Sequence, residues 1–350
     1  MSDLLTEPYK TQIESGSTTS SKFQQQLRDA LTQITVTPEL TIIHPGYELA
    51  PVSQTYQSYL QQISPSERDR YLISKLQRHL YDVFIGRQTK SQQVAEAAPA
   101  VNHGDRWYET EFYRQFLQAN HGKGYSDPGW VLTGQLGQLW QAAKDGLNLF
   151  VDPRLHLFEP QAELTIGQTM AIRLPSSAID RGVYIAVGDA GSLDSSNVSS
   201  SDIWQIYFNL DADTALVLLD FVSQELNHQM IPFELRLAYC DRDYQYLDAA
   251  ILEFSKQDWS QVQPAIDKFY RQNKAGFSSE IPFFCQLLQS GLGLAYRGKC
   301  STSDRQCNLG LEHCKIIAET IVKRLQNSNL QLQSSLDCIW QYIEQHKIAV

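Results

Sequence analysis

The sequence predicts an α+β fold, in which a helical N-terminal portion packs on a central mixed or antiparallel sheet and further helices close the chain. Apolar residues recur at helical spacing through much of the first hundred residues, a pattern that indicates amphipathic helices. Between residues 169 and 254 they fall instead into short alternating or continuous runs, as in strands. Strands grouped in the middle of a chain, with helices at both ends, favour α+β over a regular βαβ alternation.

We expect a flexible tail, a helical subdomain and an α+β domain, in that order. Residues 1–22 are polar and rich in Ser and Thr, which predicts the tail, and residues 23–100 form the helical subdomain. Its three helices are expected near 23–34, 52–63 and 65–84, and a linker near 88–100 closes it. The third helix has the clearest start, because Ser64 is followed by Pro65 and then by Glu67, the pattern of a capped N-terminus.

The α+β domain, residues 101–350, contains the predicted sheet. Short runs rich in β-branched and aromatic residues predict strands at 169–174, 182–188, 204–210, 233–238 and 249–254. Apolar residues at helical spacing predict helices at 211–227, 258–272, 281–290, 316–325 and 336–343.

Composition narrows the classes of function. The chain has 350 residues and a formal net charge of −10, which argues against a nucleic-acid binder, since such a protein needs a basic surface. No run approaches the roughly 18 apolar residues of a membrane span, and no signal peptide is visible at the N-terminus. The six cysteines are spread along a large chain, as in a reducing compartment. We therefore expect a cytoplasmic protein with neither a nucleic acid nor a membrane as partner.

The segment 102–151 concentrates cations, aromatic residues and glycines within an otherwise acidic chain. Such a segment is suited to holding an anionic group, and residues of this kind are typical of functional loops. The alternative is a structural turn, in which Asp127-Pro128-Gly129 makes the bend and Trp130 anchors it in the core.

Several ordered strings in the chain resemble the HopA-type effector family, which is named for a bacterial type III effector. The resemblance covers roughly residues 25–325. The strings that carry it are Glu111-Phe112-Tyr113-Arg114, the run Asn120 to Trp130, Lys144-Asp145-Gly146-Leu147, Ile206-Tyr207-Phe208-Asn209, Ile231-Pro232-Phe233 with Arg236, Asp248-Ala249-Ala250-Ile251-Leu252, Gly291-Leu292-Gly293-Leu294-Ala295 and Asn308-Leu309-Gly310.

The resemblance implies a lyase fold. Family members encoded beside a kinase-like protein, in clusters for lanthipeptides and thioamide peptides, look like lyases that eliminate phosphate from phosphoserine or phosphothreonine. Such a reaction needs a base for the Cα proton, donors for the phosphate and an acid for the leaving group. The resemblance implies a peptide or protein substrate, a kinase-like partner and no cofactor.

The roles can be assigned residue by residue. Lys144 is the candidate base, and His103 and His121 are the candidate acids. The candidate ligands of the phosphate and the peptide are Arg106, Arg114, Lys123, Arg236, Tyr125 and Tyr207. For Lys144 the alternative is a solvated residue in a Lys-Asp-Gly turn, for His103 a surface or capping residue, and for Arg236 a side chain that simply points out of a sheet.

Departures from the family pattern keep a second function open. The chain has Gln118 where a His is expected, Leu247 where many members carry an Arg, and no Arg after His313. Fewer phosphate ligands would suit a non-catalytic member that binds a peptide or protein. No metal is expected, because the cysteines lack the closely spaced pairs of a zinc site.

Overall fold

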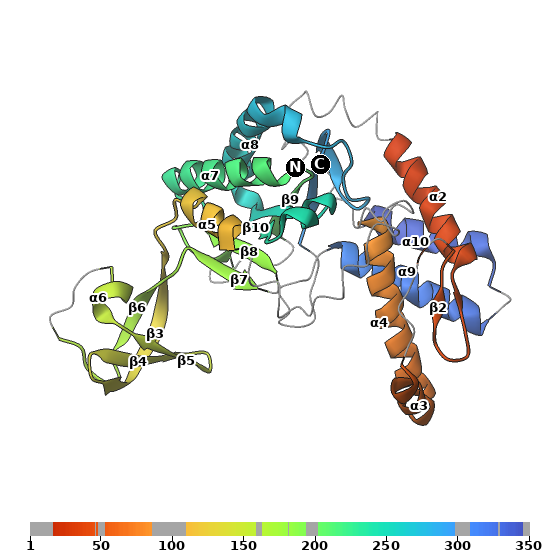
Figure 1. The fold of residues 1–350 in the computed structure, drawn as a ribbon, viewed down its shortest axis with the longest axis horizontal. Coiled ribbons are helices and arrows are strands. Elements are labelled where there is room, and N and C mark those ends of the chain that lie inside the picture. Colours follow the sequence, from red (N-terminus) through yellow and green to blue (C-terminus); the bar gives the residue numbers. More distant parts are fainter. Residues whose placement is uncertain are drawn as a thin grey trace.

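The computed structural model describes residues 17–45, 47, 53–85, 110–158, 163–180, 182–193, 202–297, 309–327 and 330–345. It confirms the predicted α+β fold (Figure 1). The helices are α2 (Ser17–Gln33), α3 (Gln54–Gln62), α4 (Pro65–Phe84), α5 (Thr110–Ala119), α6 (Pro153–His156), α7 (Ala212–His228), α8 (Trp259–Asn273), α9 (Leu309–Gln326) and α10 (Leu332–Gln345). None of these helices has the length and apolar character that crossing a membrane requires.

The strands form three antiparallel sheets within the described residues. A two-stranded ribbon pairs β1 (Thr35–Val36) with β2 (Ile42–Ile43). The central sheet has the order β12-β13-β9-β11-β10-β8-β7 and the smaller sheet the order β5-β4-β3-β6. Their strands are β3 (Tyr125–Leu136), β4 (Leu139–Lys144), β5 (Leu147–Val151), β6 (Thr169–Leu174), β7 (Ser177–Asp180), β8 (Val183–Val187), β9 (Ile203–Phe208), β10 (Phe233–Ala238), β11 (Ala250–Ser255), β12 (Gln286–Gln289) and β13 (Leu292–Tyr296).

The first face of the central sheet is apolar and is covered by helices. Ile206, Leu252 and Leu235 are successive cross-strand partners on β9, β11 and β10, and each is buried. Their core also contains apolar residues of α5, α7 and α8, and Figure 1 shows these helices grouped on one side of the sheet. Alternation along each strand buries one set of side chains here and directs the other set to the second face.

A second core joins the two ends of the chain. Leu76 and Leu80 of α4 and Ile317 of α9 are fully buried in it, and Figure 1 shows α4 lying beside α9. The same core includes Tyr207 and Ile251 of the central sheet. The N-terminal helices therefore pack on the C-terminal helices and on part of the second face of the sheet.

The smaller sheet has a core of its own and projects from the central body (Figure 1). Trp130 is 3% exposed in this core. This agrees with the alternative in which Trp130 anchors the segment in a core. The Asp127-Pro128-Gly129 string lies within β3, where the pairing with β6 shifts between Asp127 and Trp130. Gly129 has a φ of 90°, which a residue with a side chain rarely adopts. Residues 125–151 are thus mostly strand, and their glycines serve a bulge and tight turns.

Most predicted elements are confirmed, and one is wrong. The helix after Ser64 begins with a complete capping box, and α2 begins at Ser17, inside the stretch predicted as a tail. The helix expected over 281–290 is wrong, because Gln286–Gln289 is strand β12. A short apolar run is compatible with the periodicity of either a helix or a strand. A hairpin turn at Gly291, with a φ of 76°, pairs this run with β13. The predicted linker over 88–100 lies outside the described residues.

Candidate functional site

The second face of the central sheet carries polar side chains near its centre, and we call it the polar face. Gln205, Glu253 and Glu234 are successive cross-strand partners on β9, β11 and β10. In the neighbouring row, Tyr207 and Arg236 both pair with Ile251. Because residues two apart on a strand share a face, as do direct partners, the polar members of both rows lie on one face.

Glu253 is the most deeply buried carboxylate of this face, with 1% of its surface exposed. Its Oε1 accepts a hydrogen bond of 2.7 Å from the Gln205 side-chain amide, whose own oxygen accepts one of 3.2 Å from the Tyr207 hydroxyl. Its Oε2 accepts no hydrogen bond from any described residue. That oxygen lies 3.8 Å from Nη1 of Arg297, an ion-pair distance that is too long for a hydrogen bond.

Tyr207 lies among the ionisable groups of the polar face. Burial raises the pKa of its hydroxyl, the nearby Cys285, Asp248 and Glu253 raise it further, and Arg236 opposes them. The hydroxyl therefore remains a neutral hydrogen-bond donor.

Asp248 lies two residues before β11, and its Oδ2 accepts a hydrogen bond of 2.7 Å from the Tyr81 hydroxyl of α4. Burial raises the pKa of Asp248, while the Tyr81 hydroxyl and the Arg236 charge oppose that rise. This carboxyl group can therefore hold a proton at a higher pH than an ordinary aspartate, at a place where the Arg236 charge still acts on it.

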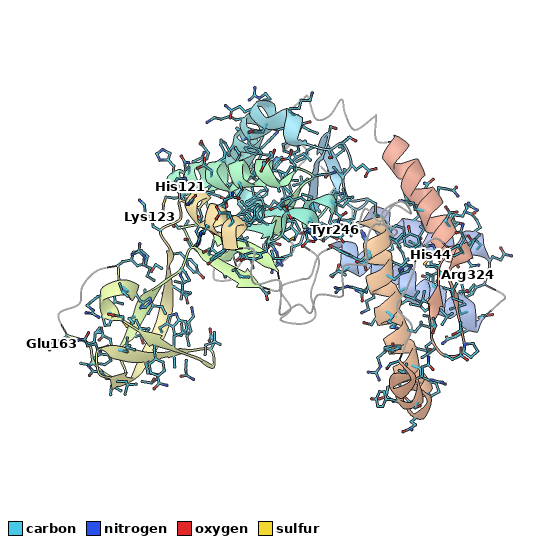
Figure 2. The ribbon with its side chains drawn as sticks, in the orientation of Figure 1. His44, His121, Lys123, Glu163, Tyr246 and Arg324 are labelled. Atoms are coloured by element: carbon cyan, nitrogen blue, oxygen red, sulfur yellow. The ribbon has the colours of Figure 1, made fainter. Side chains whose placement is uncertain are left out.

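The segment from Asn120 to Gly124 connects α5 to the smaller sheet, and Figure 2 shows His121 and Lys123 at this junction. Nε2 of His121 lies 2.7 Å from Oδ1 of Asp220 on α7. The backbone N–H groups of Lys123 and Gly124 donate to Asp189 at 2.6 and 3.1 Å. These contacts anchor the junction to the apolar-face side of the central sheet, since α7 covers that face.

Lys144, the predicted base, ends β4 and is held in an ion pair. Its Nζ lies 2.7 Å from Oδ1 of Asp127 and 6.0 Å from the centre of the Trp130 ring. The indole N–H of Trp130 donates to the other oxygen of Asp127 at 2.7 Å. In this arrangement Lys144 acts as a cation that balances a buried carboxylate.

The predicted site residues are divided between these locations. Tyr207 and Arg236 come together on the polar face, whereas His121 and Lys123 lie at the junction and Lys144 lies in the smaller sheet. Tyr125 is half-buried at the start of β3, and Arg114 is exposed on α5, 3.5 Å from Glu111. His103 and Arg106 lie outside the described residues.

Four residues of the polar face were not among the site residues predicted from the sequence, namely Gln205, Asp248, Glu253 and Arg297, although Asp248 begins one of the family strings. Gln205 and Glu253 carry a signal that points to the face, because each is a polar residue set between apolar neighbours in a run that reads as a buried strand. Among the described residues, no cluster of three or more His, Cys, Asp or Glu side chains is arranged to hold a metal ion.

The fold and this face together define an α+β protein with a buried, charged row in its central sheet. Residues 174–350 match the model of the HopA1 effector protein family, and the chain belongs to this family. The resemblance seen in the sequence is thereby confirmed. The polar-face residues on strands β9, β10 and β11 all lie within the matched stretch, and Lys144 and His121 precede it.

Two solved structures are similar to the chain. The effector protein from Pseudomonas syringae pv. tomato strain DC3000 is 13% identical, over 79% of this chain and 92% of its own, with a TM-score of 0.39. The effector protein from Pseudomonas syringae pv. syringae strain 61 is also 13% identical, over 82% and 92%, with the same TM-score of 0.39. No match is found among curated proteins.

Proposed function

We propose that the protein is a cytoplasmic lyase that eliminates phosphate from phosphoserine or phosphothreonine in a peptide or protein. The observation that carries the proposal is the placement of Arg236 and Tyr207 together on the polar face, inside the stretch that matches the family. A globular sheet gains little from ionic residues in its centre, because burying a charge is costly unless it is paired. Such residues are therefore candidates for chemistry.

The proposed roles follow from the properties of each group. The Arg236 guanidinium presents a planar set of donors that suits two phosphate oxygens, and Tyr207 beside it holds Gln205 in place through its hydroxyl. Asp248 is the proposed acid for the departing oxygen, because burial raises its pKa and lets it carry a proton. A kinase-like partner would supply the phosphorylated substrate, and the elimination itself requires no cofactor.

The roles predicted from the sequence for Lys144 and His121 stay predictions. Each of these groups is bound to a carboxylate, Asp127 in one case and Asp220 in the other. The Nζ group of Lys144 is engaged by Asp127 at 2.7 Å. Lys144 would have to leave Asp127 before it could take a proton.

The test is incubation of the full chain with a phosphoserine peptide, followed by mass spectrometry of the peptide. We expect the peptide to lose one phosphoric acid, and Arg236→Gln to abolish both this loss and peptide binding measured by fluorescence anisotropy. The matched control is Arg271→Gln, which removes an exposed arginine of α8. Binding without phosphate release would favour the alternative, a non-catalytic member that binds a peptide or protein. Absence of binding would contradict a phosphate site on the polar face.

A further inference from the structure

Glu253 combines deep burial with an incompletely satisfied carboxylate. It is 1% exposed, and Oε2 accepts no hydrogen bond from the described residues. A buried carboxylate oxygen without a hydrogen bond is costly to leave in a folded protein. The neighbouring Glu234 differs in this respect, because its Oε1 accepts a hydrogen bond of 2.9 Å from Ser192. The row thus contains two adjacent buried carboxylates, and one oxygen of Glu253 accepts no hydrogen bond from the described residues.

We propose that Glu253 is the general base that removes the Cα proton of the phosphorylated residue, with Gln205 and Arg297 as positioning residues. The proposal rests on the phosphate-elimination function proposed above. Neither the family match nor the motifs of the sequence assign Glu253 a part in the chemistry.

The hydrogen-bond geometry favours this role. The Gln205 amide donates to Oε1 of Glu253 while its oxygen accepts from the Tyr207 hydroxyl, so the amide is fixed from both ends. This contact orients the carboxylate through Oε1 and leaves Oε2 without a hydrogen bond. Arg297 lies 3.8 Å from Oε2, an ion-pair distance that leaves this oxygen without a hydrogen bond.

The position of Glu253 relative to Arg236 fits one substrate residue. Arg236 pairs directly with Ile251, so Glu253 is its diagonal neighbour on the same face. Diagonal side chains of this kind start about 7–8 Å apart. A phosphate bound by the long Arg236 side chain can therefore leave the attached Cβ and Cα between Arg236 and Glu253.

The reaction balances with groups of this chain. Oε2 of Glu253 takes the Cα proton, and the electrons of the C–H bond form the Cα=Cβ double bond. The Cβ–O bond breaks with both electrons moving to the phosphate oxygen, which takes the proton of Asp248. The products are a dehydro residue and hydrogen phosphate. Exchange with solvent then removes the proton from Glu253 and restores one to Asp248.

The experiment compares Glu253→Gln with Glu234→Gln, a neighbouring buried carboxylate outside the proposed machinery. We expect Glu253→Gln to lower the turnover number by about 100- to 10,000-fold while leaving phosphopeptide binding and the melting temperature close to wild type. Glu234→Gln should retain most of the turnover. In Glu253→Ala, added formate should restore a part of the lost rate, because a small carboxylate can occupy the space and accept the proton, which a purely structural role would not produce.

The outcomes separate this inference from the function on which it rests. If wild type eliminates phosphate and Glu253→Gln does so at a similar rate, the base is elsewhere and the lyase proposal stands. If Glu253→Gln loses binding and turnover together, or if formate has no effect on folded Glu253→Ala, Glu253 is structural. If wild type itself releases no phosphate, both the lyase proposal and its base are overturned.

Discussion

Lowering the pH should destabilise the N-terminal helices through a buried pair of histidines. His44, which follows β2, and His79 of α4 are 6% and 5% exposed, and Nδ1 of His44 lies 2.8 Å from Nε2 of His79. The Tyr47 ring stacks on His44, with ring centres 4.5 Å apart. One ring nitrogen must donate and the other accept, so the contact needs at least one neutral ring and is lost when both are protonated.

The size of the effect follows from the pKa of His79. Burial, and then the charge of His44, lower it from 6.5 to about 4. Burial also lowers the pKa of His44, with Asp29 opposing. Below pH 6.5 the unfolded chain binds a proton that folded His79 does not, so stability falls as the pH drops and levels off near pH 4. A shift from 6.5 to about 4, at about 1.36 kcal/mol per unit, gives a loss of about 3 kcal/mol.

Urea unfolding at a series of pH values between about 7 and about 4 measures this loss. His79→Gln should flatten the curve, because glutamine can keep a hydrogen bond to His44 but does not titrate. His228→Gln, at the exposed C-terminal end of α7, is the control and should leave the curve unchanged. Equal pH dependence in wild type and His79→Gln would refute the assignment of the loss to this pair.

Three further variants test other parts of the molecule. Ser64→Ala removes the capping box of α4 and should lower the free energy of unfolding by about 1 kcal/mol; the exposed Ser66→Ala should not. Tyr81→Phe removes a hydrogen bond that lowers the pKa of Asp248, so the alkaline limb of the rate of phosphate elimination should move to higher pH. Lys144→Ala breaks the ion pair with Asp127 and should destabilise the smaller sheet by about 1–3 kcal/mol with phosphate elimination retained. Loss of elimination in a folded Lys144→Ala protein would assign the base to Lys144, as the sequence predicted.

Local signals explain what could be predicted from the sequence. The helix start at Ser64 depends on three neighbouring residues, and the structure shows the complete capping box. The runs that became β9, β10 and β11 are rich in β-branched and aromatic residues, which identifies strands without knowledge of their partners. Tyr207 and Arg236 were likewise identified as candidate site residues from the family motifs that lie in these strands.

Long-range packing explains what could not be predicted. Tyr81 and Asp248 are 167 positions apart and meet only because α4 packs beside the central sheet. Tertiary structure also explains why the candidate cationic side chains lie at separate places in the fold. Lys144 and Asp127 become partners through the pairing of β3 with β4. The glycines and turn residues of this segment had predicted loops and turns. No spacing along the chain indicated that Lys144 and His121 would each meet a carboxylate.

The N-terminal helices are part of the candidate site and do more than cover the sheet. Tyr81 reaches Asp248 from α4, and apolar residues of α4 and α9 share a core with Tyr207 and Ile251. Burial by these helices raises the pKa of Asp248 and Tyr207 and strengthens every electrostatic interaction on the polar face, because the surroundings are less polar than water. The stretch 174–350 supplies the charged row, and α4, which precedes it, contributes the Tyr81 hydroxyl that opposes the rise in the pKa of Asp248.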